Sequence, residues 1–181
     1  MTRYRSYHGG TATTMAATGD FRRHFAEAGT SGFVKIVDPT PFGFSWGDDE
    51  ATACARALGA LREQILMEGP ETIACMLLEA VPGAAGVLLP PKGYMEGVAA
   101  LCKEHGILLV ADEVMTGFGR SGEMFGFQHY AIQPDTVCKS NLQPDFNVRE
   151  FECFDTSTSV VLRELDESDR FVQKSAESTS I

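Results

Sequence analysis

Two carboxylates stand where a parallel sheet would hold a ligand. Glu79 follows an unbroken apolar run at 73–78, and Asp112 follows a second run at 107–111. Ligands of open α/β sheets bind outside the carboxyl ends of the strands, so both side chains are expected to face one crevice. A carboxylate in such a place can pair with a protonated ring nitrogen, accept a proton or ligate a metal, and it can also simply cap the turn after its strand.

A glycine-rich segment offers a different chemistry. Residues 117–122 read GFGRSG and fit the G-x-G-x-x-G pattern of dinucleotide-binding loops. In that fingerprint the loop joins a strand directly to a helix, whose N-terminus meets the pyrophosphate. Here Asp112 and Glu113 intervene, and residues 123–127 are not a helix start. A nucleotide-binding module therefore stays only a third alternative.

The sequence carries no signature of a metal site or of a nucleophile elbow. The four histidines stand apart from one another and form no HExxH pair, and no GxSxG segment occurs. The five cysteines are odd in number, widely spaced and without a CxxC pair, which argues against a zinc site and against a disulfide framework. We therefore expect no metal and a reducing compartment.

Strand and helix signals alternate along the part of the chain that carries both carboxylates. A β-branched, glycine-bounded run predicts a strand at 32–37, and apolar residues spaced by three and four after Asp49 predict a helix that stops at Gly69. Three further elements follow: a strand buried on both faces at 73–78, a helix at 91–105 that two prolines open, and a strand at 107–111. These three form a βαβ unit, which is almost always a right-handed crossover between parallel strands, so the fold class is α/β.

Composition limits the partners of the chain. Its 181 residues are 44% hydrophobic and 22% charged, which is typical of a globular protein with a buried core. Fifteen Lys and Arg against 25 Asp and Glu give a net charge of −10, which argues against nucleic acid. Because no apolar run approaches the ~20 residues of a membrane helix and the start does not read as a secretory signal, we expect no membrane partner.

A compositional break divides the chain after residue 138. All 18 glycines lie at or before Gly126, and residues 139–181 contain none. The Ser- and Thr-rich end predicts partial disorder, and the apolar residues within 159–165 predict a short helix. We therefore separate residues 1–138 from a divergent, partly disordered C-terminal tail at 139–181.

Several motifs occur together in one order and spacing. They are RYRSYHGGT at 3–11, Gly19 with Asp20, EAVPGAAG at 79–86, PPKGY at 90–94 and ILLVADEVMTGFGRSG at 107–122. In this combination the chain resembles the class III aminotransferases, the pyridoxal-phosphate (PLP) dependent family of ω-amino-acid and ornithine transaminases. The resemblance spans residues 4–138. It implies that residues 1–138 are an incomplete part of the large parallel-sheet domain of a fold type I PLP-dependent transferase.

The resemblance also implies roles for five residues of a PLP site. Tyr7 would stack on one face of the pyridine ring with His8 beside it, and Val114 would pack on the opposite face. Asp112 would pair with the ring nitrogen and keep it protonated, so that the ring can act as an electron sink. Glu79 would lie near the ring hydroxyl. Tyr7 and Val114 are equally reasonable core residues, and Glu79 is equally reasonable as a structural residue.

The sequence departs from the family at the lysine that forms the Schiff base with PLP. The position expected for that lysine holds Asn141, and Lys139 falls two residues early. Two residues along a strand displace an amine by ~6–7 Å, so Lys139 is only an off-register candidate. The family's Gly- and Ser-rich phosphate cup and its small C-terminal domain are also absent from this sequence. An altered splice, a retained intron or a frameshift would produce such a break.

We therefore expect a truncated aminotransferase. By family it would move an amino group from an ω-amino acid or similar donor to a keto acid such as pyruvate, but this chain alone would be inactive. The alternative is a non-catalytic fragment that binds a full-length subunit or keeps part of the cofactor cleft. Full-length members would be homodimers, in the cytoplasm or, if a targeting segment precedes, in mitochondria. We also expect open edges and exposed apolar faces at strands 73–78 and 107–111, with marginal stability or aggregation as the result.

Overall fold

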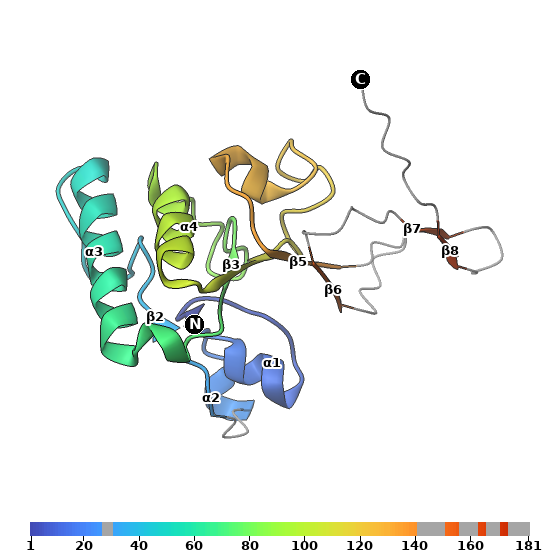
Figure 1. The fold of residues 1–181 in the computed structure, drawn as a ribbon, viewed down its shortest axis with the longest axis horizontal. Coiled ribbons are helices and arrows are strands. Elements are labelled where there is room, and N and C mark those ends of the chain that lie inside the picture. The colour runs from blue at the N-terminus through green and yellow to red at the C-terminus, as the bar shows by residue number, and fades with distance from the viewer. Residues whose placement is uncertain (27–30, 141–150, 156–162, 166–170, 174–181) are drawn as a thin grey trace.

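The computed structural model describes residues 1–26 and 31–140 and three short strands in the C-terminal region (Figure 1). In chain order the elements are β1 (Thr2–Arg3), α1 (Ala12–Ala17), α2 (Arg23–Ala26), β2 (Lys35–Ile36), α3 (Glu50–Glu68), the 3-10 helix η1 (Pro70–Thr72), β3 (Cys75–Glu79), α4 (Tyr94–His105), β4 (Leu108–Asp112), the 3-10 helix η2 (Gly126–Tyr130), β5 (Thr136–Ser140), β6 (Phe151–Asp155), β7 (Arg163–Leu165) and β8 (Phe171–Gln173). Within these ranges no helix is both long and apolar enough to cross a membrane.

The predicted βαβ unit is confirmed. Strands β3 and β4 pair in parallel, with a register that runs from Cys75 opposite Leu108 to Glu79 opposite Asp112. Strand β5 continues the sheet in parallel and places Cys138 opposite Asp112, whereas β6 pairs with β5 antiparallel. The sheet order β3-β4-β5-β6 with helices packed on it confirms the α/β fold class.

Helices α3 and α4 lie side by side over one face of the sheet (Figure 1). Helix α3 begins after Asp49, whose side chain accepts a hydrogen bond from the Thr52 amide at 2.8 Å, and it ends at Gly69 as predicted. Helix α4 begins at Tyr94, three residues later than expected, because Gly93 has a left-handed backbone with φ of 86°. Between the helices and the sheet lies an apolar core that includes Cys54, Leu61, Ile65, Met76, Leu78, Val98, Leu101 and Leu109.

The expectation that strand β3 is buried on both faces is wrong. Met76 and Leu78 are buried under the helices, but the alternate residue Leu77 is only half-buried. In β4 the side chain of Leu108 is 52% exposed. The physical reason is that α3 and α4 both lie on the Met76 side, whereas the opposite side is covered near the carboxyl ends of the strands by the segment around Tyr7.

The expected open strand edges are also wrong. Strand β4 lies between β3 and β5. The other edge of β3 is occupied by Met1, whose amino group donates to the Cys75 carbonyl at 2.6 Å and whose carbonyl accepts from the Leu77 amide at 3.0 Å. Strand β1 then pairs in parallel with β2, which is shorter than the strand expected at 32–37. Main-chain bonding of the N-terminal segment to β3 thus brings residues 1–8 to the sheet.

The C-terminal region differs from expectation where it is described. The last three residues of the helix predicted at 159–165 form strand β7, which pairs antiparallel with β8. Residues 159–162, and the end of the chain for which we predict disorder, lie outside the described residues.

Candidate functional site

The two carboxylates singled out in the sequence end neighbouring strands and face one pocket. Glu79 is the last residue of β3 and Asp112 the last residue of β4, and the parallel register sets them opposite each other. Both are buried, at 5% and 6% exposure, and both line a pocket of about 570 Å³. The expectation that they share a crevice is confirmed.

Asp112 is held by two donors from different parts of the chain. Its Oδ2 lies 2.7 Å from His8 Nδ1, and its Oδ1 accepts from the Val114 amide at 3.1 Å. His8 is itself anchored, because its amide donates to Thr18 Oγ1 at 3.0 Å. Since a carboxylate only accepts, the proton of this contact resides on His8 Nδ1. The arrangement fixes both the orientation of the carboxylate and the tautomer of the imidazole.

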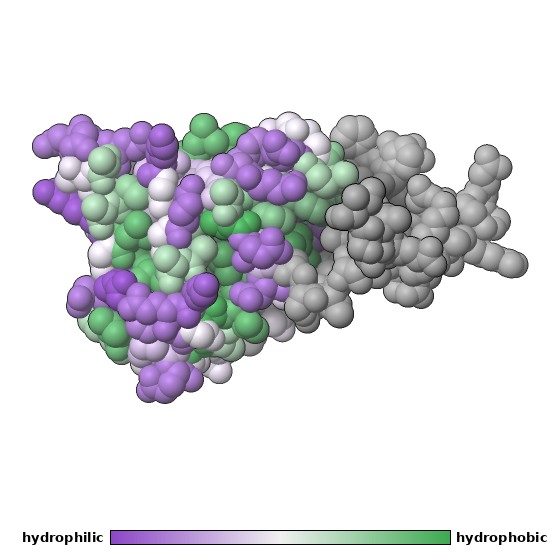
Figure 2. Space-filling view, turned by 45° about the horizontal axis from the view of Figure 1, so that its top comes forward, coloured by the Kyte–Doolittle hydropathy of each residue, from purple (hydrophilic) through white to green (hydrophobic). Residues whose placement is uncertain are grey.

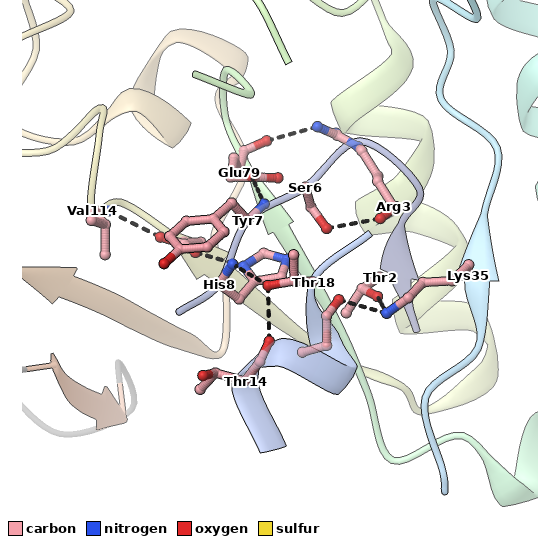
Figure 3. Close-up of polar contacts among 12 residues, drawn as sticks. Thr2, Arg3, Ser6, Tyr7, His8, Thr14, Thr18, Lys35, Glu79 and Val114 are labelled. Carbon is pink, nitrogen blue, oxygen red and sulfur yellow. Dashed lines mark hydrogen bonds and ion pairs between the residues drawn. The ribbon is translucent and has the colours of Figure 1, made fainter. Parts of the chain in front are cut away.

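Among the described residues, hydrogen-bond partners reach only one carboxylate oxygen of Glu79. Its Oε1 accepts from the Tyr7 amide at 3.3 Å, and its backbone carbonyl accepts from Arg3 Nη1 at 3.1 Å (Figure 3). Burial raises the pKa of Glu79, while electrostatic interactions with His8 and Arg3 oppose that shift and the Asp112 carboxylate adds to it. Within the described residues, Glu79 Oε2 and His8 Nε2 are buried polar atoms with no hydrogen-bond partner. Such atoms beside a pocket are where a ligand would complete the bonding.

The walls of the pocket carry the other predicted residues. Tyr7, 38% exposed, and Val114 both line it, so all five residues assigned to a cofactor site by resemblance surround one space. Sequence reasoning missed Arg22, which also lines the pocket and places its guanidinium carbon 4.8 Å from the centroid of the Tyr7 ring. Arg22 lies in the turn before α2, two residues after the Gly19–Asp20 pair, but no spacing rule pointed to it.

Lys139, the off-register candidate, lies on β5 but projects from the face opposite to Asp112. Cys138 is the residue paired with Asp112, and side chains alternate between the faces of a strand. Lys139 Nζ lies 5.8 Å from the centroid of the Phe118 ring. In the described part of the chain Lys139 is not among the residues that line the pocket. Asn141, at the position expected for the family lysine, lies outside the described residues.

Glu113 is a third buried carboxylate beside Glu79 and Asp112, and the sequence did not single it out. It is fully buried and accepts from Thr116 Oγ1 at 2.5 Å, from the Gly126 amide at 2.7 Å and from the Phe127 amide at 2.8 Å. These bonds tie the loop that contains residues 117–122 to the end of β4. Residues 117–122 form turns, and no α-helix follows them directly, as a dinucleotide fingerprint requires. The expectation that no helix starts within 123–127 is wrong in part, because the 3-10 helix η2 begins at Gly126.

Over the residues that the structure describes, no group of three or more His, Cys, Asp or Glu is arranged to hold a metal ion. Cys54, Cys75 and Cys102 are free thiols.

Comparison with protein families identifies relatives over most of the chain. The family model described as aminotransferase class-III matches residues 1–143. The taurine–pyruvate aminotransferase of Rhodobacter capsulatus is 42% identical over 137 residues, which is 75% of this chain and 29% of the relative. The mitochondrial γ-aminobutyrate transaminase 1 of Oryza sativa subsp. japonica is 44% identical over 75% of this chain and 27% of its own length. The chain thus spans less than a third of the curated relatives it matches.

Solved structures of similar sequence have the same fold as the matched part of this chain. One similar structure is a taurine:2-oxoglutarate aminotransferase from Bifidobacterium kashiwanohense, in complex with PLP and glutamate. It superposes with a TM-score of 0.72 at 47% sequence identity, and the match covers 77% of this chain and 32% of that chain. An (S)-enantioselective ω-transaminase from Thermomicrobium roseum gives a TM-score of 0.70 at 40% identity over 77% of this chain and 31% of its own.

Proposed function

Because this chain belongs to the class III aminotransferases, we propose that residues 1–138 supply the ring-binding part of the PLP site of a transaminase. The reaction would transfer an amino group from an ω-amino acid or similar amine donor to a keto acid such as pyruvate. The observation that carries the proposal is the pairing of Glu79 and Asp112 at the ends of adjacent parallel strands, with His8 bonded to Asp112 at 2.7 Å.

Two observations support the fit of this site to PLP. The buried His8 Nε2 and Glu79 Oε2 lack partners among the described residues, and both side chains line the pocket. The Asp112 carboxylate beside them is suited to a ring that carries a proton on nitrogen, because an ionised acceptor shortens and strengthens such a hydrogen bond. The pocket therefore offers an acceptor for the ring nitrogen and further polar atoms for the ring substituents.

When bound, PLP supplies an electron sink for the carbanion that forms next to the amino group. The residues of this chain would serve that chemistry by position. Asp112 would hold the proton at the ring nitrogen, and His8 would keep the carboxylate turned toward the pocket. Tyr7 and Val114 would cover opposite faces of the ring, and Glu79 would lie near the ring hydroxyl.

This chain alone is proposed to be inactive. Lys139 is on the wrong face of β5 to act beside Asp112, and the expected lysine position is Asn141. The full activity, its donors and acceptors, and the dimer of the full-length family would then need a longer protein. A reducing compartment, the cytoplasm or the mitochondrial matrix, is proposed on the five widely spaced cysteines.

The test is binding of pyridoxamine 5′-phosphate, which needs no lysine, measured by isothermal titration. We expect Asp112→Asn to weaken binding by about ten-fold or more, because the ring nitrogen loses a charged acceptor. Asp48→Asn, which removes one exposed carboxylate away from this pocket, is the matched control and should bind as the wild type does. Equal affinities of Asp112→Asn and wild type would refute the assignment.

Inactivity is tested separately with PLP and borohydride reduction, followed by intact mass and peptide mapping. We expect no site-selective phosphopyridoxyl adduct on any lysine. A single adduct that maps to Lys139 would show that the lysine reaches the cofactor after all.

A further inference from the structure

The wall of the pocket carries charged side chains of both signs, and they differ in exposure: the acidic ones are buried and the basic one is partly exposed. Its buried end carries the carboxylates of Glu79 and Asp112. Nearer the solvent the wall carries Arg22, whose side chain is 45% exposed and is the only Lys or Arg side chain among the described residues that line the pocket. A ligand with a positive and a negative group would therefore enter this pocket in one orientation.

The position of Arg22 is fixed by contacts on two sides. Asp20, whose side chain is only 9% exposed, forms an ion pair with the Arg22 guanidinium and accepts from the Arg22 amide at 2.9 Å. The guanidinium carbon lies 4.8 Å from the centroid of the Tyr7 ring, a cation–π contact. A planar group held in this way has little side-chain entropy left to lose when it binds an anion.

Arg22 also keeps donors for a ligand. A guanidinium has five N–H groups, and the contact with Asp20 through Nη1 is the only hydrogen bond of this guanidinium to the described residues. Its fork matches the oxygens of a carboxylate or a sulfonate in a bidentate contact. The carboxylates at the buried end would repel the same anion, whereas the Arg22 guanidinium would attract it.

We propose that Arg22 is a specificity-determining residue, which binds the anionic group of the amine donor while the amino group points toward the carboxylate end of the pocket. This inference rests on the proposed function, which supplies the substrate class. The substrates are amines that carry a carboxylate or a sulfonate at the end remote from the reacting nitrogen. The inference extends that function by naming the residue that separates these donors from uncharged alkylamines.

The test is an NMR titration of the full chain with 2-aminoethanesulfonate, 4-aminobutanoate and n-butylamine, each added separately. The Nε–H signal of Arg22 is assigned by its absence from the spectrum of Arg22→Gln. We expect this signal to shift with both anionic amines and not with butylamine. Arg22→Gln should bind the anionic amines about ten-fold more weakly than the wild type, as loss of a charge-assisted hydrogen bond predicts. The ratio of the two anionic affinities distinguishes sulfonate from carboxylate donors.

Arg23→Gln is the matched control, because it makes the same change of charge one residue along and Arg23 does not line the pocket. It should bind all three amines as the wild type does. An Arg22 signal that ignores the anionic amines, or an Arg22→Gln variant that binds them as tightly as wild type, would overturn the inference.

Pyridoxamine 5′-phosphate, titrated into the same proteins, separates this inference from the proposed function. If Arg22→Gln loses affinity for this compound and not for the amines, the guanidinium binds the cofactor phosphate and the inference is wrong. If the wild type fails to bind the compound but Arg22 still responds selectively to anionic amines, the cofactor assignment fails and the anion site stands.

Discussion

At the scale of single residues, Glu79 is a carboxyl group in a buried position that disfavours its ionised form. Its burial raises its pKa, and the nearby Asp112 carboxylate acts in the same direction. Electrostatic interactions with His8 and Arg3 offset the effect only in part. Glu79 is therefore protonated at higher pH than a free glutamate, and a protonated carboxyl can donate a hydrogen bond into the pocket.

Glu79→Gln tests this account through stability. Because the folded-state pKa lies above the ordinary 4.5, ionisation costs the wild type stability as pH rises from about that value through the folded pKa. Glutamine keeps an oxygen for the Tyr7 amide and does not ionise. Relative to wild type, the free energy of unfolding of Glu79→Gln should rise across that window and then level off. Urea unfolding from pH 4 to 8 measures it.

The exposed Glu63→Gln on α3 is the control for that series and should show little pH-dependent difference. A constant offset between Glu79→Gln and wild type at every pH would contradict the raised pKa.

At the scale of elements, the close approach of the loop after α1 to the N-terminal segment positions Tyr7 and His8. The Gly19 amide donates to the Ser6 carbonyl at 2.9 Å. A Cβ on residue 19 would overlap the carbonyl oxygen of Arg3 and the backbone of Tyr4, and backbone atoms cannot rotate away as a flexible side chain can. Only glycine fits at position 19, because there is no space for a Cβ atom.

Gly19→Ala should therefore lower the free energy of unfolding by about 3 kcal/mol and weaken pyridoxamine 5′-phosphate binding, because the segment that carries His8 must shift. Gly59→Ala is the control. Gly59 is exposed in the middle of α3, where an added Cβ meets nothing within 4 Å, so alanine should stabilise the helix by up to ~1 kcal/mol. Chemical denaturation of both variants checks the pair, and a Gly19→Ala variant as stable as wild type would contradict the steric account.

Elements with local sequence signals could be predicted from the sequence. Elements whose formation depends on pairing with a distant segment could not. Helix α3 could be placed because Asp49 and Gly69 cap it, and Glu79 and Asp112 could be placed because strand ends are readable from apolar runs. Strand β1 was missed, because two residues are too short for a hydrophobic pattern. Its position is set instead by pairing with β2 and by the hydrogen bonds of the preceding Met1 to β3. Arg22 was missed for a similar reason, because only the folded loop brings it over Tyr7.

At the scale of the whole molecule, the described part of the chain leaves apolar side chains at its surface. Val87, Leu89 and Met115 are 70%, 69% and 57% exposed and line a second pocket of about 570 Å³. Leu108 adds an exposed residue on the sheet. Figure 2 shows hydrophobic residues interspersed with hydrophilic ones over the face it displays. Apolar surface of this kind favours association, and the net charge of −10 opposes it.

We expect the apolar surface to prevail at physiological ionic strength, because salt screens the repulsion between chains over about 8 Å and leaves the hydrophobic attraction intact. The purified chain should form oligomers at micromolar concentration in light-scattering chromatography, and more so as salt is added. Leu89→Lys should reduce the oligomer fraction several-fold. Leu66→Lys, which changes an exposed leucine of α3 that lines neither pocket, should not. A monodisperse monomer with one sharp, cooperative thermal transition would mean that the described core is sufficient by itself and that the exposed apolar residues need no partner.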